Sequence, residues 1–104
     1  MRGDVHAVPG RRGARGHEQR GARYGVILQS DDLMLSTVLV APTSRSAPPR
    51  PFRPAIELAG AQTTVLLEQT RAIDIDHLGE WVGRLTRAEL DRIEQALALV
   101  LALD

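Results

Sequence analysis

The sequence predicts an α+β fold in which short antiparallel strands form a compact sheet or small barrel that one C-terminal helix closes. Short apolar runs recur along residues 3–76 and are separated by turn-forming residues, as expected for successive strands. Apolar side chains at helical spacing follow over residues 90–101. A chain of 104 residues can build one substantial core, so residues 1–104 are expected to form a single domain.

Five segments are expected to be strands because each is a short run of aliphatic or β-branched residues. In chain order they are 3–8, 23–29, 36–42, 55–58 and 63–69, and 70–76 continues in extended form. Turns are expected at 30–35 and 59–62, where polar residues or glycine interrupt the apolar runs.

Two longer polar segments lie between these strands. Residues 9–22 are rich in glycine and arginine, and residues 43–54 are rich in proline and contain three arginines and one phenylalanine. Long loops in a compact domain are usually functional or disordered. These two loops are therefore the expected walls of a binding surface.

The C-terminal helix has a clear start signal. Thr86 and Glu89 are spaced as a capping box, in which each side chain satisfies a free backbone amide of the first turn. The stripe expected to face the sheet consists of Leu90, Ile93, Leu97, Val100 and Leu101. Residues 95–104 are apolar on more than one face, which is typical of either deep core or a subunit interface.

Several functional classes are disfavoured by what the sequence lacks. It has no cysteine, no Walker-type glycine loop and no HExxH motif, so no metal and no other cofactor is expected. No apolar run reaches the length of a membrane span, and the first residues do not form the apolar core of a signal peptide. A soluble cytoplasmic protein without a membrane partner is expected.

The charge is zero overall but unevenly distributed. Residues 1–53 carry nine arginines and four acidic residues, a net charge of +5, whereas residues 54–104 carry four arginines and nine acidic residues, a net charge of −5. A basic half suits a phosphate-bearing partner, although an ordinary solvated surface has the same composition.

Five segments together resemble one family, the MazF/PemK/Kid endoribonuclease toxins of bacterial toxin–antitoxin systems. The segments are RGDV at 2–5, GHEQRGARY at 16–24, VLVAPTS at 38–44, VLLEQTRAID at 65–74 and LGEWVGRLT at 78–86. Their order and spacing match those of the family through nearly the whole chain. The resemblance implies an SH3-like β-barrel of the PemK/CcdB type, a symmetric homodimer and inhibition by a cognate antitoxin.

Three positions depart from the family pattern. His6 stands where the family usually has tryptophan, and Tyr24 replaces the usual proline after the motif arginine. Leu66 occupies a position, two residues before the acid of the EQ motif, that is basic in some members. A catalytic or RNA-holding arginine of those members is therefore absent here.

The resemblance implies a catalytic set of Arg23, Thr43, Glu68 and His17. An arginine fork matches two phosphate oxygens and is always charged, so Arg23 is expected to stabilise the phosphate. Thr43 can donate a hydrogen bond to a phosphate oxygen or cap a turn. Glu68 and His17 are the alternatives for the general base, and Glu68 is also expected to pair with Arg71 or Arg23.

Further residues are expected to bind RNA. Gln19 and Gln69 are interpreted as orienting or base-contacting amides, and Ser44 accompanies Thr43. Single-stranded RNA is recognised through stacking on aromatic or arginine side chains and through base-edge hydrogen bonds. The loop at 45–53 offers such groups in Arg45, Arg50, Phe52 and Arg53.

The sequence thus predicts a metal-independent endoribonuclease that cleaves single-stranded mRNA at a short motif. By resemblance, the products carry a 2′,3′-cyclic phosphate and a 5′-hydroxyl. Two alternatives share the fold. One is a CcdB-type toxin that binds gyrase, and the other is a degenerate member that only binds RNA or antitoxin.

Overall fold

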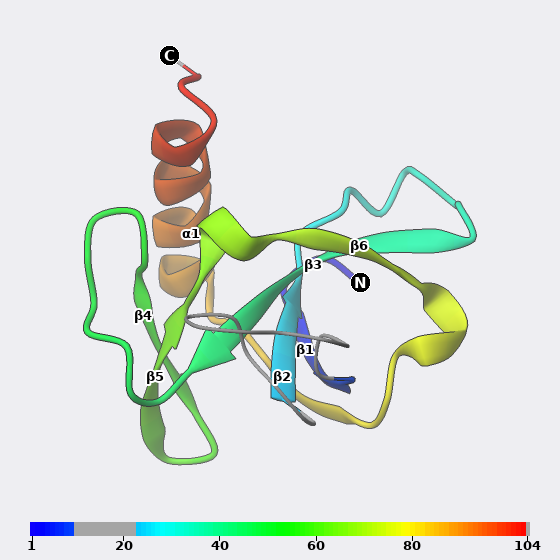
Figure 1. Cartoon of the computed structure of the whole chain (residues 1–104), viewed down its shortest axis with the longest axis horizontal. Helices are drawn as coiled ribbons and strands as arrows, with labels where there is room; N and C mark the ends of the chain where they lie inside the picture. Colours follow the sequence, from blue (N-terminus) through cyan, green and yellow to red (C-terminus); the bar gives the residue numbers. More distant parts are fainter. Residues whose placement is uncertain (10–22, 104) are drawn as a thin grey trace.

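The computed structural model describes residues 1–9 and 23–103, which form a nearly closed antiparallel β-barrel with one C-terminal helix (Figure 1). The strands are β1 (Asp4–Val8), β2 (Arg23–Ile27), β3 (Thr37–Ser44), β4 (Ala55–Leu58), β5 (Ala61–Val65), β6 (Arg71–Asp74) and β7 (Trp81–Arg84). The helices are the 3₁₀ turns η1 (Leu67–Gln69) and η2 (Ile75–His77) and the α-helix α1 (Arg87–Val100). The predicted fold class is confirmed.

The barrel is built by antiparallel pairing in the order β4-β5-β3-β2-β1-β7, and β6 pairs with β3 outside this path. Its two end strands approach each other where the Leu58 side chain of β4 faces Gly83 of β7. A Cβ atom placed on Gly83 of β7 would lie 3.5 Å from Leu58 Cδ1 of β4. Figure 1 shows α1 standing beside the β4–β5 hairpin, where it covers one side of the barrel.

Strand β3 is the central strand and changes partners along its length. Its first half pairs with β6, from Thr37 opposite Asp74 to Val40 opposite Arg71. Its last two residues pair with β5 instead, and β2 lies along its other edge. The end of β3 therefore sits between β2 and β5, which fixes where the loop after Ser44 begins.

The predicted strand at 63–69 is too long, because β5 ends at Val65 and η1 follows. Leu66 and Leu67 are neighbours and are both buried, at 2% and 1% exposure. Successive residues of a strand point to opposite faces, so a regular strand would send these two side chains in opposite directions. The 3₁₀ turn places Leu67 in the core beside α1 and leaves Glu68 at the surface.

Strand β7 was not predicted. Its four residues have no clear alternation, and one of them is a glycine. The strand exists because it pairs with β1, from Asp4 opposite Arg84 to His6 opposite Trp81, with an irregularity between Val5 and His6. Such long-range pairing has no local signal.

The capping box at the start of α1 is confirmed. The Thr86 side chain accepts a bond from the Glu89 amide at 3.1 Å, and Glu89 Oε1 accepts one from the Thr86 amide at 2.9 Å. The other carboxylate oxygen of Glu89 accepts a bond from the Glu57 amide at 2.8 Å. A cap of this type is worth about 1 kcal/mol, and this one also ties α1 to β4.

Four of the five residues predicted to face the sheet do so. Ile93 is fully buried, and Leu90, Leu97 and Val100 pack against the main core. The prediction is wrong for Leu101, which is 59% exposed, because α1 ends at Val100. None of the helices in the described part of the chain is long and apolar enough to cross a membrane.

Candidate active site

A cavity of about 450 Å³ opens where β1, β2, β3 and β5 meet. Its described lining consists of Ala7, Arg23, Tyr24, Thr43, Ser44, Arg45, Ser46 and Thr63. Two guanidinium groups and several hydroxyls thus share one hollow with one aromatic ring. This composition suits an anionic ligand that also carries a flat, partly apolar group.

The backbone brings Arg23 and Thr43 to the same wall. Arg23 begins β2, and the register of β2 with β3 sets Gly25 opposite Pro42. Thr43 Oγ1 donates a hydrogen bond to the Tyr24 carbonyl at 3.0 Å. Next to this bond, Gly25 leaves room for the apolar cluster of Val8 and Val40, because a Cβ at that position would lie only 2.4 Å from the Val40 side chain.

Ser44 organises the loop that follows β3. Its Oγ accepts hydrogen bonds from the amides of Ser46 and Ala47, at 3.2 and 3.1 Å. The Thr64 hydroxyl of β5 then donates to the Ala47 carbonyl at 2.8 Å. These bonds hold the chain around Arg45 against the cavity.

Glu68 pairs with Arg53 rather than with either predicted partner. The Arg53 Nε donates to Glu68 Oε2 at 2.8 Å, and its Nη2 donates to the same oxygen. Among the described residues, neither Arg23 nor Arg71 forms an ion pair with Glu68, and Arg71 donates to the Pro9 carbonyl at 2.7 Å. The partner is non-local, since Arg53 precedes β4 whereas Glu68 follows β5, so sequence spacing did not reveal it.

This pair determines the electrostatics of Glu68. Burial raises the pKa of the carboxyl group, but the hydrogen bond and the charge of Arg53, together with backbone and Gln69 hydrogen bonds, outweigh burial and hold that pKa below its usual value. The hydrogen bond to Glu68 likewise raises the pKa of Arg53. Glu68 is therefore a paired, ionised carboxylate.

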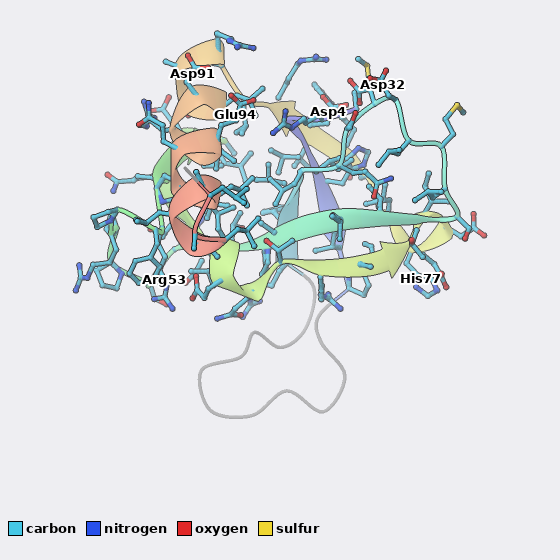
Figure 2. The ribbon with its side chains drawn as sticks, turned by 90° about the horizontal axis from the view of Figure 1, so that it is seen from above. Asp4, Asp32, Arg53, His77, Asp91 and Glu94 are labelled. Carbon is cyan, nitrogen blue, oxygen red and sulfur yellow. The ribbon has the colours of Figure 1, made fainter. Side chains whose placement is uncertain are left out.

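The acidic residues labelled in Figure 2 lie on the side of the molecule opposite Arg53. Three of them are engaged in ion pairs, among them Asp91, which pairs with Arg87 at 3.2 Å. Glu94 of α1 pairs with Arg2 at 3.1 Å, and Asp4 of β1 lies 3.5 Å from Arg84. These labelled acidic residues thus lie away from Arg53, whose own charge is paired with Glu68.

The other predicted RNA-binding residues lie outside the described lining of the cavity. Arg50 lies beside a second hollow, between the proline-rich loop and α1, where it donates to the Pro49 carbonyl at 2.8 Å. Phe52 lies under Arg53, whose guanidinium carbon is 5.4 Å from the ring centre. Gln69 is half-buried on η1.

Of the predicted site residues, the cavity thus brings together Arg23, Thr43, Ser44 and Arg45. His17 and Gln19 lie outside the described residues. Tyr24 lines the cavity although the sequence did not predict it as a site residue. Its place directly after Arg23 on β2 gave no signal for this, because successive residues of a regular strand point to opposite faces.

The other two departures from the family pattern have structural roles. Leu66 is buried in the core at 2% exposure, so this position contributes packing rather than charge. His6 Nδ1 lies 3.0 Å from the Gly79 carbonyl and joins β1 to the segment before β7.

No cluster of His, Asp or Glu in residues 1–9 and 23–103 is arranged to hold a metal ion.

The fold and the site define the class as a small β-barrel with one C-terminal helix and a cavity lined by arginine and hydroxyl side chains. The family of PemK-like, MazF-like toxins of type II toxin–antitoxin systems matches residues 1–101, and the chain belongs to this family. It is also 41% identical over 104 residues to the candidate toxin Rv3098A of Mycobacterium tuberculosis, covering 99% of this chain and 98% of that protein.

Solved structures share the fold. A mycobacterial endoribonuclease in complex with its cognate antitoxin superposes with a TM-score of 0.81 at 21% identity, covering 100% of this chain and 96% of that one. Toxin MazF-mt6 of M. tuberculosis gives 0.80 at 19% identity, with 97% and 98% covered. MazF of Deinococcus radiodurans gives 0.78 at 20% identity, with 97% and 94% covered.

Proposed function

We propose that this protein is a sequence-specific, metal-independent endoribonuclease toxin that cleaves single-stranded mRNA. The observation that carries the proposal is the presence of Arg23, Thr43, Ser44 and Arg45 in one cavity of a PemK-like, MazF-like fold. Two guanidinium groups and two hydroxyls can supply the positive charge and the hydrogen bonds that the oxygens of a phosphodiester require.

The proposed reaction needs only groups of the protein and the RNA. The ribose 2′-oxygen forms a bond to the adjacent phosphorus and passes its proton to a general base. The bond between phosphorus and the 5′-oxygen breaks, and that oxygen takes up a proton. The products are a 2′,3′-cyclic phosphate and a 5′-hydroxyl. Negative charge gathers on the phosphate oxygens in the transition state, and Arg23 is proposed to stabilise it.

Thr43 is proposed to act beside Arg23. Its side chain is 3% exposed, and its hydroxyl proton is donated to the Tyr24 carbonyl. In the free protein Thr43 therefore holds β3 against the start of β2, next to Arg23. Donation to a phosphate oxygen would require the hydroxyl to rotate away from that carbonyl.

The general base is proposed to be either Glu68 or His17, and further RNA contacts are proposed for Gln19, Arg50, Phe52, Arg53 and Gln69. Of the RNA-binding residues predicted in the 45–53 loop, Arg45 lines the cavity. Arg50, from the same loop, lines the second hollow beside α1. A strand of RNA several nucleotides long is proposed to reach this second hollow.

An antitoxin is the proposed inhibitor, through an acidic segment that becomes ordered as it covers the basic cavity. One of the similar solved structures is an endoribonuclease in complex with its cognate antitoxin. An acidic chain and RNA would then compete for the same guanidinium groups. Added antitoxin should therefore stop cleavage.

Cleavage of a long single-stranded RNA in excess EDTA tests the proposal. We expect cuts at a short recurring motif, mapped from the new 5′ ends, which should need phosphorylation before ligation because they carry hydroxyls. Intact RNA would overturn the ribonuclease assignment and favour a toxin that binds gyrase or one that only binds RNA. Cleavage that disappears with EDTA would overturn metal independence.

A homodimer is also proposed, because the described part of the chain exposes two groups of large apolar side chains. One group is at the end of α1, with Leu99, Leu101 and Leu103 each about 60% exposed. The other consists of Leu33, Met34, Leu35, Leu39 and Ile75. Sedimentation should give twice the monomer mass at micromolar concentration, and Leu39→Glu or Leu101→Glu should identify the interface by halving that mass. A monomer mass for the unmodified protein would contradict the proposal.

A further inference from the structure

Tyr24 lines the cavity, but neither the predicted nor the proposed site gives it a task. It stands where the family usually has proline, and it follows Arg23 on β2. Its side chain is 40% exposed although it belongs to a strand of the barrel. Exposing a large ring to water gains nothing for folding, so its position calls for another reason.

The surroundings of Tyr24 leave its ring accessible. Its cross-strand neighbour on β1 is Ala7, whose methyl group is too small to cover an aromatic ring. Ala7 and Tyr24 both line the cavity. The Tyr24 backbone is held in place by the hydrogen bond from Thr43. The ring therefore stands on a fixed strand and faces an open hollow.

The chain has only three aromatic residues. Phe52 has the Arg53 guanidinium near its ring, and Trp81 is on β7, opposite His6. Among the described residues of the cavity, Tyr24 supplies the single aromatic ring, beside Arg23 and Arg45. Single-stranded RNA offers alternating phosphates and flat bases, and proteins bind the bases by stacking them on aromatic rings.

We infer that Tyr24 is a base-stacking residue, which holds one of the two nucleobases that flank the phosphate bound by Arg23. The inference rests on the proposed function and adds to it a contact that helps to select the cleavage site. Stacking of one base on an aromatic side chain strengthens binding about 5- to 150-fold. Tyr24→Leu should therefore reduce kcat/KM about tenfold on ordinary RNA.

A cycle that combines protein and RNA changes tests the contact. The two RNA substrates carry an abasic nucleotide on one or the other side of the cleaved bond. With the unmodified protein, kcat/KM for one of the two abasic substrates should be about tenfold lower than for ordinary RNA. With that substrate, Tyr24→Leu should cause no further loss, because the stacked base is already absent. Tyr24→Phe, which keeps the ring, should preserve the dependence on that base.

Trp81→Leu is the matched control, since it removes an exposed aromatic ring outside the described lining and should preserve the dependence on the base. Additive losses from Tyr24→Leu and both abasic substrates would overturn the inference, as would a Tyr24→Phe variant that behaves like Tyr24→Leu.

Binding of mixed-sequence 2′-deoxy oligonucleotides, followed in parallel, needs no catalysis. A protein that binds these oligonucleotides but does not cleave RNA would contradict the proposed function. In that case Tyr24→Leu should still weaken binding of the oligonucleotides, which keeps the stacking inference testable. A protein that binds no single-stranded oligonucleotide would overturn both.

Discussion

Arg23→Ala is expected to reduce RNA cleavage about 1,000-fold while leaving the fold intact. Arg23 begins β2, is exposed and lines the cavity beside Thr43. Removing a group that stabilises developing oxyanion charge typically costs about 10²–10³ in kcat, or about 3–4 kcal/mol. Single-turnover cleavage of an RNA that carries one mapped site measures the loss directly.

Arg23→Lys should recover only part of the rate. Lysine keeps the charge but lacks the planar fork that contacts two phosphate oxygens at once. The matched control is Arg87→Ala, because Arg87 is an exposed arginine of α1 that pairs with Asp91 at 3.2 Å. The control should cleave RNA normally, and all three variants should unfold near the temperature of the unmodified protein. An Arg23→Ala variant that cuts the same sites at the normal rate would show that another group performs the chemistry.

The elements that the sequence predicted are those with local signals. The capping box was readable because Thr86 and Glu89 lie three residues apart and act on each other's amides. β4 was bounded correctly because its alternating pattern stands between proline and glycine. In contrast, β7 depends on β1, almost eighty residues away in the sequence, and no property of its own four residues specifies that pairing.

The candidate site shows the same division. The motif residues Arg23, Thr43 and Ser44 reach one cavity because β2 and β3 are neighbours, an arrangement that the family pattern implies. The partner of Glu68 could not be predicted, because η1 turns this carboxylate toward a loop that is distant in sequence. Side-chain pairing across such a turn depends on the exact path of the backbone.

Reversal of one charge in the Arg53–Glu68 pair is the second change expected to have a large effect. The pair joins η1 to the end of the loop that begins at Ser44 and carries Arg45 to the cavity. Arg53→Glu would place two carboxylates together. Because both partners are about 30% exposed, loss of the pair and the new repulsion should cost only about 2 kcal/mol, or about 30-fold in kcat/KM, mainly as a higher KM.

The swapped variant, Arg53→Glu with Glu68→Arg, provides the control. It restores opposite charges with the positions exchanged, so it should recover most of the loss if the pair acts by holding the loop. If Arg53 instead contacts RNA through its own guanidinium, the swap should leave KM as high as in Arg53→Glu. Comparison of the three KM values thus separates an indirect role from direct contact with RNA.

Glu68→Gln separates this positioning role from that of a general base. Because the folded-state pKa of Glu68 is lowered, its stabilising pair is present above the ordinary carboxyl pKa and is lost only as the pH falls through the lowered value. Between pH 5.5 and 8 the carboxylate stays ionised, so it cannot produce an acidic limb of the rate profile there.

Loss of a general base typically lowers kcat by about 10²–10⁴. We expect Glu68→Gln to raise KM severalfold while kcat and the shape of the pH profile persist, which would assign a limb near pH 6.5 to a histidine such as His17. A hundredfold fall in kcat would instead make Glu68 the base.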